Sequence, residues 1–238
     1  MSNSFQFKQF KIQQDQCAMK VSLDACLFAA VCDVSNAKRV LDIGAGTGLL
    51  SLMLAQRTPA EIEGVELDPR AYQQAQQNAL QSPFHNQIEL FNCTIQDFQT
   101  AYNHKTFDTI ICNPPFFSGQ LEGPNTQRNL ARHNSQLSFE DLSNVIAKFL
   151  TPTGKAWLLL PPDEQEYFNQ YAKQHGLHLQ SHTQIVPRNN KPSKLGIWVY
   201  SLLPCEDIEK DNITIYQSQS NEYTQKFKGY LSDYYLKL

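Results

Sequence analysis

Four consecutive residues, Asn113, Pro114, Pro115 and Phe116, carry groups that could orient an amino nitrogen for reaction. They follow an apolar segment, 108–112, that is typical of a strand, so they would stand at its carboxyl end. The Asn113 side-chain oxygen and the Pro114 carbonyl can each accept one hydrogen of the same amino group. Because the lone pair of an aromatic amine is delocalised into its ring, two such acceptors would direct it toward an electrophile. The prolines restrict the backbone, and Phe116 offers a face on which a planar acceptor could stack. This chemistry requires no dedicated base or metal.

A glycine-rich turn follows the first expected strand, 40–43, and opens the helix expected over 49–57. Glycine allows such a turn to take unusual dihedral angles and to bring backbone amides against a ligand. A dinucleotide fingerprint would need glycine at position 49, which is leucine, so the spacing does not indicate a pyrophosphate site. It resembles instead the motif in which methyltransferases cradle the methionine part of S-adenosylmethionine. That resemblance assigns to the cofactor Asp42, Gly44, Ala45, Gly46 and Gly48.

Acidic residues after the next two expected strands fit the rest of such a cofactor. Glu66 ends the second strand, 24 residues after Asp42, which is close to the separation expected of a carboxylate that binds both ribose hydroxyls. Leu67 is placed to pack on the adenine ring. After the third strand the family has an acidic residue that accepts from the adenine amino group, followed by an apolar neighbour. Asp97 and Phe98 fit these two roles.

Short apolar segments alternate with helical patterns along most of the chain. Because a strand, a helix and a strand in succession pair in parallel, this order predicts an α/β fold with helices on both faces of a sheet. The last two strands lack a helix between them, which predicts that one edge strand runs antiparallel. Seven mostly parallel strands of this kind resemble the Rossmann-like sheet of the class I methyltransferases. The strands are expected over 40–43, 62–67, 88–91, 109–112, 156–160, 177–186 and 195–203, and the helices over 49–57, 69–81, 139–150 and 164–175.

Length and composition favour one main domain. With 238 residues, 41% of them hydrophobic, the chain can bury one substantial core, whereas two full domains would be cramped. We expect a helical N-terminal extension over the cofactor site, residues 1–36, and a methyltransferase domain, residues 37–238. The tail of that domain, from about residue 211, is expected to form an appendage.

The composition also argues against several classes of protein. The N-terminus is polar, and no apolar run approaches the roughly 20 residues that span a bilayer, so we expect a soluble cytoplasmic protein. The six cysteines show no pair at the spacing of a zinc or redox site. A net charge of −3 does not favour nucleic-acid binding, so any such role must rest on local basic clusters.

Segments on either side of these motifs narrow the family. Residues 17–25, 128–133, 223–224 and 234–237 resemble the bacterial valine-tRNA (adenine-N6)-methyltransferases, which act on the adenine just 3′ of the anticodon. The resemblance covers nearly the whole chain. It implies S-adenosylmethionine as cofactor and valine tRNA as partner, with no obligate protein partner evident. It places over the cofactor Lys20, Ser22 and Asp24.

Two basic clusters could hold RNA phosphates beside the reacting nucleotide. The first cluster follows the Asn-Pro-Pro-Phe turn and the second precedes the last expected strand. Both could also be ordinary solvated charge, and His133 could equally be a structural hydrogen-bonding residue. An anticodon loop would suit such a site because it offers an unstacked base, whereas a paired base must first be flipped out. The residues of the two clusters are Arg128, Arg132 and His133, and Arg188, Lys191 and Lys194.

Other acceptors can use the same chemistry. Enzymes that methylate a release-factor glutamine also carry Asn-Pro-Pro, but usually with tyrosine next and with a longer helical N-terminal domain. Enzymes that methylate the amino group of guanine in ribosomal RNA carry Asn-Pro-Pro-Phe in longer chains. A scaffold without catalysis is a third alternative, against which the intact Asn113 and glycine turn argue.

Overall fold

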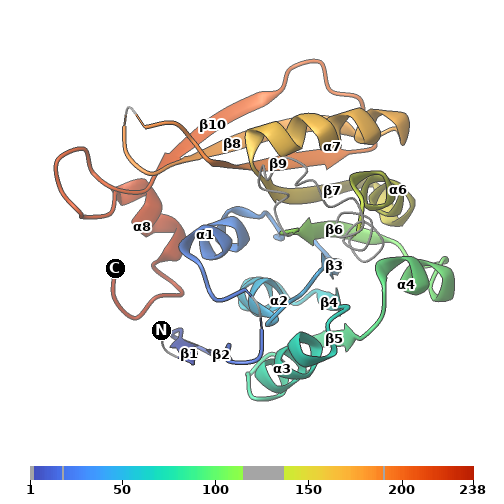
Figure 1. The fold of residues 1–238 in the computed structure, drawn as a ribbon, viewed down its shortest axis with the longest axis horizontal. Helices are drawn as coiled ribbons and strands as arrows, with labels where there is room; N and C mark the ends of the chain where they lie inside the picture. Colours follow the sequence, from blue (N-terminus) through green and yellow to red (C-terminus); the bar gives the residue numbers. More distant parts are fainter. Residues whose placement is uncertain (1–2, 18, 115–136, 190) are drawn as a thin grey trace, which may run out of the picture.

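The computed structural model describes residues 3–17, 19–114, 137–189 and 191–238. Within these residues the central sheet has eight strands, in the order β10-β8-β9-β7-β6-β3-β4-β5 (Figure 1). Its strands are β3 (Arg39–Ile43), β4 (Glu61–Val65), β5 (Ile88–Phe91), β6 (Phe107–Cys112), β7 (Leu150–Leu160), β8 (His178–Val186), β9 (Leu195–Ser201) and β10 (Glu209–Thr214). A separate two-stranded sheet pairs β1 (Ser4–Gln6) with β2 (Lys11–Gln13). The helices are α1 (Leu23–Val31), α2 (Leu49–Ala55), α3 (Pro69–Leu80), α4 (Ile95–Ala101), α6 (Phe139–Phe149), α7 (Pro162–Gln174) and α8 (Gln225–Leu231).

The predicted α/β class and the seven predicted strands are confirmed, with two differences. The antiparallel strand, β9, is not at the edge, because it pairs with β7 on one side and β8 on the other. The chain crosses to β8 first and then returns through a hairpin into the gap beside β7. The eighth strand, β10, pairs in parallel with β8 and forms the edge where an appendage was expected. Its sequence has a single buried apolar residue, Ile213, so no hydrophobic pattern marks it as a strand.

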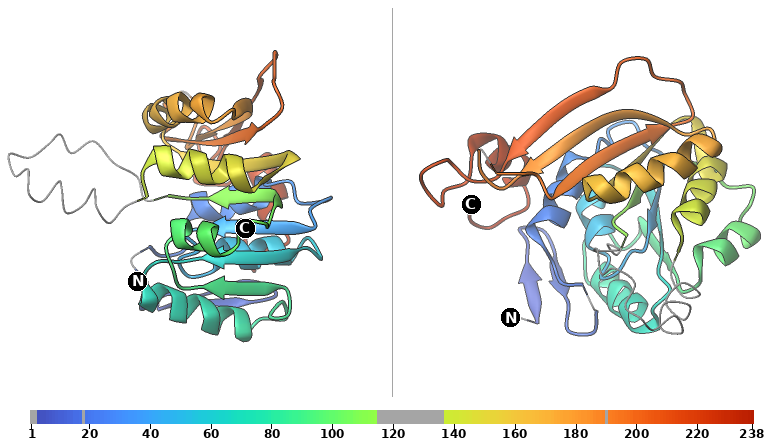
Figure 2. Two further views of the ribbon diagram at one scale, coloured as in Figure 1. Left: turned by 90° about the vertical axis from the view of Figure 1, so that its right-hand side faces the viewer. Right: turned by 45° about the horizontal axis from the view of Figure 1, so that its top comes forward.

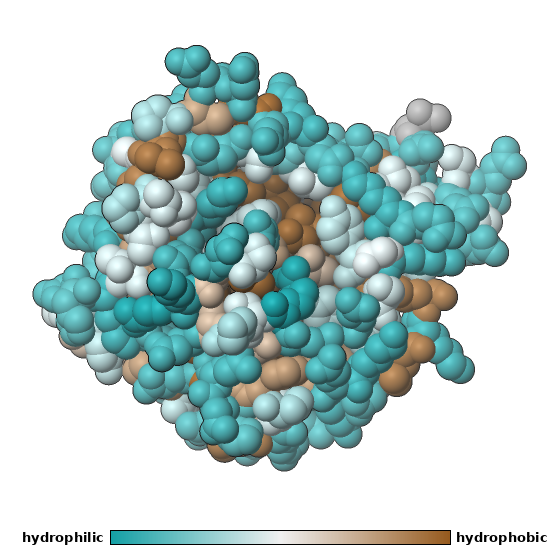
Figure 3. All heavy atoms as spheres, turned by 180° about the vertical axis from the view of Figure 1, so that it is seen from behind, coloured by the Kyte–Doolittle hydropathy of each residue, from teal (hydrophilic) through white to brown (hydrophobic). Residues whose placement is uncertain are grey.

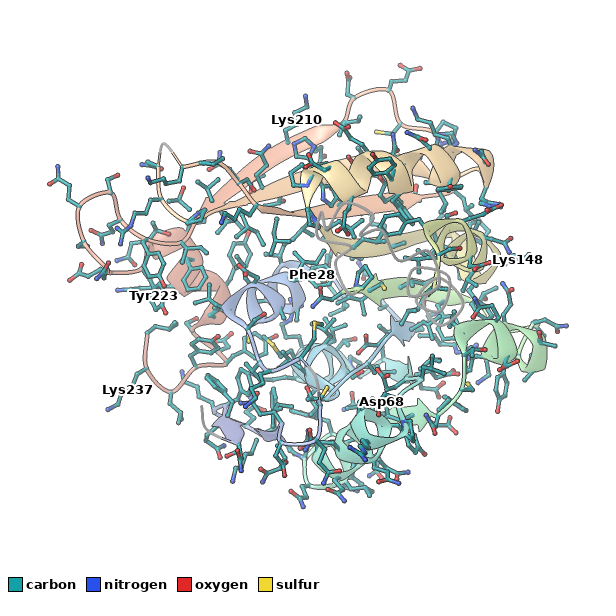
Figure 4. All side chains as sticks on the ribbon, viewed as in Figure 1. Phe28, Asp68, Lys148, Lys210, Tyr223 and Lys237 are labelled. Carbon is teal, nitrogen blue, oxygen red and sulfur yellow. The ribbon has the colours of Figure 1, made fainter. Side chains whose placement is uncertain are left out.

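Successive strand residues point to opposite faces of the sheet, where they meet different helices (Figures 1 and 2). Val40 and Ile111 belong to one hydrophobic cluster with α1, α2 and α8, whereas Leu41 and Ile110 belong to a second cluster with α4, α6 and α7. Phe28 of α1 lies in the interior of the first layer (Figure 4). Seen from behind, the molecule presents a mostly hydrophilic surface (Figure 3). No helix in the described segments is long and apolar enough to cross a membrane.

Side-chain caps fix where several helices begin. At the start of α6 the Ser138 hydroxyl accepts from the amide of Asp141 and donates to its carboxylate. Thr94 and Asp97 form the same arrangement at the start of α4, a helix that the sequence pattern did not predict. Asp68 accepts from two amides of the first turn of α3, with Pro69 next to it.

The two ends of the chain pack together and against α2 (Figure 1). Phe7 forms a β-bridge with Tyr235, and the amide of Lys8 donates to the carbonyl of Tyr234 at 2.8 Å. The hydroxyl of Tyr234, a residue only 1% exposed, donates to the carbonyl of Met53 in α2 at 2.9 Å. The expected helical extension is therefore only partly helical, because a β-hairpin precedes α1. This hairpin, α1 and the tail share one hydrophobic cluster with α2.

We predict that Tyr234→Phe lowers the free energy of unfolding by about 1 to 2 kcal/mol, because it leaves the buried carbonyl of Met53 without this donor. Urea denaturation at neutral pH measures the change. Tyr167→Phe is the matched control, since Tyr167 is 62% exposed, and should cost less than about 0.5 kcal/mol. Equal losses in both variants would contradict a structural role of the Tyr234 hydroxyl.

Candidate active site

A cavity of about 300 Å³ opens at the carboxyl ends of β3 and β6. Four parts of the chain form it: the segment that leads into α1, the glycine turn with the start of α2, the end of β6, and the facing parts of β7 and β9. Parallel strands bring such distant segments to one edge of a sheet, where α/β proteins bind ligands. The lining residues are Met19, Lys20, Ser22, Asp24, Ala25, Gly44, Ala45, Gly46, Thr47, Leu49, Leu50, Asn113, Leu159 and Leu195.

The glycine turn has the backbone geometry that its sequence predicts. Gly44, Gly46 and Gly48 have φ angles of 76°, 57° and 78°, in the left-handed region that glycine adopts without strain. The amides of Gly44 and Ala45 donate to the carbonyl of Val65 at 2.9 and 3.1 Å, which joins the turn to the end of β4. Gly48 does not line the cavity, and a Cβ there would lie 3.4 Å from the side chain of Ala75 in α3. Its role is close packing of helix against turn.

Asp42 lies beneath this turn and is completely buried. Its Oδ2 accepts from the amide of Ser51 at 3.1 Å and from the Ser51 hydroxyl at 2.6 Å. Burial raises the pKa of Asp42 to about 6, against the effect of the two hydrogen bonds from Ser51. Asp42 is not among the residues that line the cavity, and its carboxylate anchors α2 to β3. Its contact with the cofactor stays a prediction.

Glu66 lies beside the turn, half-buried, and is held by backbone amides. Its two carboxylate oxygens accept from Gly46 and Asp68, both at 2.8 Å. Each carboxylate oxygen can accept a further hydrogen bond, so the group remains able to bind a diol. The neighbouring Leu67 is 52% exposed, and neither residue lines the 300 Å³ cavity itself.

The structure separates Asp97 and Phe98 from the cavity. The carboxylate of Asp97 accepts from the Thr94 hydroxyl at 2.7 Å, within the cap of α4. Phe98 is 1% exposed and packs its ring against those of Phe91 and Phe149 in the second hydrophobic cluster. This corrects the expectation that Phe98 contacts the cofactor, because the ring would have to leave the core to do so. An apolar residue after a strand fits a ligand contact and a core position equally well.

Asn113 is the polar side chain that the sequence singled out for chemistry, and it borders the cavity. Its Oδ1 is buried and accepts no hydrogen bond from the described residues. A buried acceptor without a donor costs free energy, so such an atom marks a place where a ligand can donate. Pro114 follows, also buried. The other residues of the turn and the first basic cluster, Pro115, Phe116, Arg128, Arg132 and His133, lie outside the described residues.

The N-terminal residues assigned to the cofactor lie together at the cavity. Ser22 caps α1 by accepting from the amide of Ala25 at 3.1 Å, and Asp24 follows in the first turn. Burial raises the pKa of Asp24. Lys20 is exposed at the rim. These positions place the start of α1 opposite the glycine turn.

Sequence reasoning missed several lining residues. Thr47, Leu49 and Leu50 belong to the turn or to the first turn of α2, so their adjacency to the glycines was a usable signal. Leu159 and Leu195 had no such signal, because the pairing of β7 with β6 brings Leu159 to this edge and the pairing of β7 with β9 brings Leu195 there.

The second basic cluster lies in the loop between β8 and β9, and its members differ in environment. The guanidinium of Arg188 donates to the carbonyls of Gln217 and Ser220 and to the side chain of Asn221. Lys191 and Lys194 are exposed. Arg188 therefore joins two loops, a role that the sequence reasoning had not given it.

The buried carboxylate of Asp42 predicts a pH dependence of stability. Its pKa of about 6 in the folded chain lies above the ordinary value of 3.8, so the folded state binds this proton more tightly. The destabilisation by the charge is absent below pH 3.8 and complete above about pH 6. We therefore expect the free energy of unfolding of Asp42→Asn, relative to that of the parent, to rise by about 2 kcal/mol between about pH 4.5 and pH 7. Urea denaturation measures this difference. A difference that stays constant with pH, as we expect for the exposed Asp207→Asn control, would contradict the burial argument.

Comparison with known proteins agrees with this site. A family model described as the methyltransferase small domain matches residues 17–158. A Dyadobacter fermentans protein named tRNA1(Val) (adenine(37)-N6)-methyltransferase is 41% identical over 236 residues, covering 98% of this chain and 97% of that protein. A Pseudoalteromonas translucida protein of the same name is 40% identical over 237 residues, covering 99% and 100%.

A crystal structure titled as a predicted O-methyltransferase from Agrobacterium tumefaciens has the same fold, with a TM-score of 0.67 and 19% identity over 88% of this chain and 96% of that one. The extent and identity of the sequence matches decide the family. The chain belongs to the methyltransferase small domain family and, within it, to the family of tRNA1(Val) (adenine(37)-N6)-methyltransferases.

Proposed function

We propose that this protein methylates the 6-amino group of an adenine in the anticodon loop of valine tRNA, with S-adenosylmethionine as methyl donor. The observation that carries the proposal is the buried Oδ1 of Asn113, which has no hydrogen-bond partner among the described residues and lies at the edge of a cavity formed by the glycine turn. The names of relatives at 40 and 41% identity support the choice of acceptor. We place the reaction in the cytoplasm, where its tRNA substrate is found.

The residues at the cavity fit the proposed cofactor. Gly44 leaves open space where a Cβ would be, so its backbone can contact a ligand closely. Gly44, Ala45 and Gly46 would hold the methionine part, and Glu66 would accept from the ribose hydroxyls. We propose that residues 1–36 form the roof, through Lys20, Ser22 and Asp24. When bound, S-adenosylmethionine supplies a methyl group on a positively charged sulfur.

Asn113 and Pro114 then act on the acceptor nitrogen. The Asn113 Oδ1 accepts one hydrogen of the amino group and the Pro114 carbonyl accepts the other, which increases electron density on nitrogen and fixes the direction of its lone pair. The methylated nitrogen is a strongly acidic ammonium, so its proton can leave to water without a dedicated base. In a buried site these two hydrogen bonds are stronger than in water. Positioning and hydrogen bonding therefore account for the role of these residues.

An acceptor assay decides between this function and its alternatives. The protein is incubated with labelled S-adenosylmethionine and, separately, with unmodified valine tRNA, ribosomal RNA and a translation release factor. We expect label in tRNA, at the 6-amino group of a single adenine of the anticodon loop. Label in release factor or ribosomal RNA with none in tRNA would overturn the proposed acceptor while leaving the methyltransfer chemistry intact.

We predict that Asn113→Ala lowers turnover at least about 1,000-fold, because one of the two acceptors that orient the amino group is lost. The affinity for S-adenosylmethionine, measured by calorimetry, should stay within about tenfold of the parent. Asn36→Ala is the control, since Asn36 is exposed and lies outside the cavity. Near-normal turnover in Asn113→Ala would remove this residue from the chemistry.

Two glycines with the same backbone geometry test the cofactor site. Gly44 and Gly176 have φ angles of 76° and 74°, and a Cβ at either position meets nothing within 4 Å. Backbone strain from the substitution to alanine should therefore lower the free energy of unfolding by a similar amount in both variants, about 1 kcal/mol. Since Gly44 alone of the two lines the cavity, we predict that Gly44→Ala weakens S-adenosylmethionine binding at least about tenfold and that Gly176→Ala leaves it unchanged. Equal affinities in the two variants would place the cofactor elsewhere.

A further inference from the structure

A second, larger hollow of about 890 Å³ lies between the loop that follows β8 and the loop that follows β10. The residues that matter in it are Arg188, Lys191, Lys194, Tyr216, Asn221 and Tyr223. No acidic side chain lines it within the described part of the chain. Three cations thus gather in one groove of a protein whose net charge is −3. We call this hollow the basic groove.

One wall of the basic groove is a continuous stack of side chains. The guanidinium of Arg188 lies 5.2 Å from the ring centre of Tyr216, which stacks on Tyr223 at 5.2 Å with 22° between the ring planes. Tyr223 in turn packs on Phe227 of α8 at 4.7 Å, beside that helix (Figure 4). Because neighbours cover Tyr216 on two sides and Tyr223 likewise, these rings form a rigid wall and offer no free platform for a stacked base.

The backbone at both edges of the groove is fixed as well. The amides of Ile215 and Tyr216 donate to the carbonyls of Val186 and Pro187 at 2.9 and 3.0 Å, so the two loops continue the pairing of β8 with β10 (Figure 1). The hydroxyl of Ser193 is within 2.9 Å of the carbonyl of Ile185 and 2.7 Å of that of Leu195. The backbone of both loops is therefore fixed where it borders the basic groove, and hydrogen bonds hold Arg188 in its wall.

The basic groove also adjoins the active site. Lys194 lines the groove, and the next residue, Leu195, lines the cavity that holds Asn113. The loop that carries Lys191 and Lys194 therefore leads directly to the edge of the cavity. Both lysines are exposed, and within the described chain no ion pair joins either of them to a carboxylate. Their ammonium groups can therefore bind phosphate.

We propose that the basic groove binds the sugar–phosphate backbone of the tRNA next to the methylated nucleotide, with Lys191 and Lys194 contacting phosphates. Arg188 and the stacked tyrosines hold the wall. Because the rings are covered and the cations are lysines, the contact reads no sequence and serves to position the RNA. This inference rests on the proposed function and specifies where the substrate lies beyond the cavity.

The test compares two double variants with the same change of charge. K191Q/K194Q removes the groove lysines, and K148Q/K173Q removes exposed lysines of α6 and α7 on another part of the surface (Figure 4 labels Lys148). Binding of fluorescent unmodified valine tRNA is followed by anisotropy at several salt concentrations. For K191Q/K194Q we expect about tenfold weaker binding at about 150 mM salt, and a slope of log K against log salt reduced by about two. The control and the affinity for S-adenosylmethionine should not change.

A second RNA separates backbone contact from base reading. For a tRNA whose base pairs in the anticodon stem are inverted, K191Q/K194Q should lose affinity by the same factor as for the unaltered valine tRNA, because the phosphates are unchanged. A loss confined to one stem sequence would overturn the backbone assignment. Unchanged tRNA binding in K191Q/K194Q would overturn the groove proposal alone, provided that the parent protein still methylates tRNA. If the parent protein binds and methylates release factor in place of tRNA, and K191Q/K194Q loses this binding and methylation, both proposals are overturned.

Discussion

The anchoring of Ser51 by the buried carboxylate of Asp42 is the interaction on which the active site depends. This pair fixes the first turn of α2 to the end of β3, and the glycine turn between them has little freedom left. The amides of Gly44 and Ala45 then bind the end of β4, and that of Gly46 binds Glu66. Burying a carboxylate is unfavourable, as its raised pKa shows, so the fold gives up stability here for a defined turn.

Helix α1, whose first turn borders the cavity, is held by the Rossmann-like core and by the C-terminal tail. Arg57 donates to the carbonyls of Ala29 and Cys32 at 2.7 and 2.6 Å, which closes the end of α1. Tyr235, from the tail, is hydrogen-bonded to the thiol of Cys26 in the same helix. The C-terminal tail therefore contacts the same helix that borders the cavity with its first turn.

The sequence was sufficient for those features in which one residue type has one physical use. Glycines with positive φ at 44, 46 and 48 belong to this kind, as does an asparagine oxygen at a strand end that accepts no hydrogen bond from the residues that the structure describes. It failed where the same residue type has two uses. Phe98 could have packed on a ligand or in the core, and Arg188 could have bound phosphate or a neighbouring loop. The strand β10 was invisible because edge pairing through the backbone needs no hydrophobic pattern. Leu159 and Leu195 were unpredictable because tertiary pairing alone brings them together.

The internal position of β9 brings the basic groove next to the cavity. Because β8 runs parallel to β7, the loop that follows β8 lies at the carboxyl edge of the sheet. Because β9 begins beside β7, Lys194 and Leu195 lie next to the cavity that Asn113 lines. The pairing of β10 with β8 then brings the stack of Tyr216 and Tyr223 against the same loop and holds Arg188 in place. The edge strand that carries no sequence signal therefore completes the wall of the basic groove.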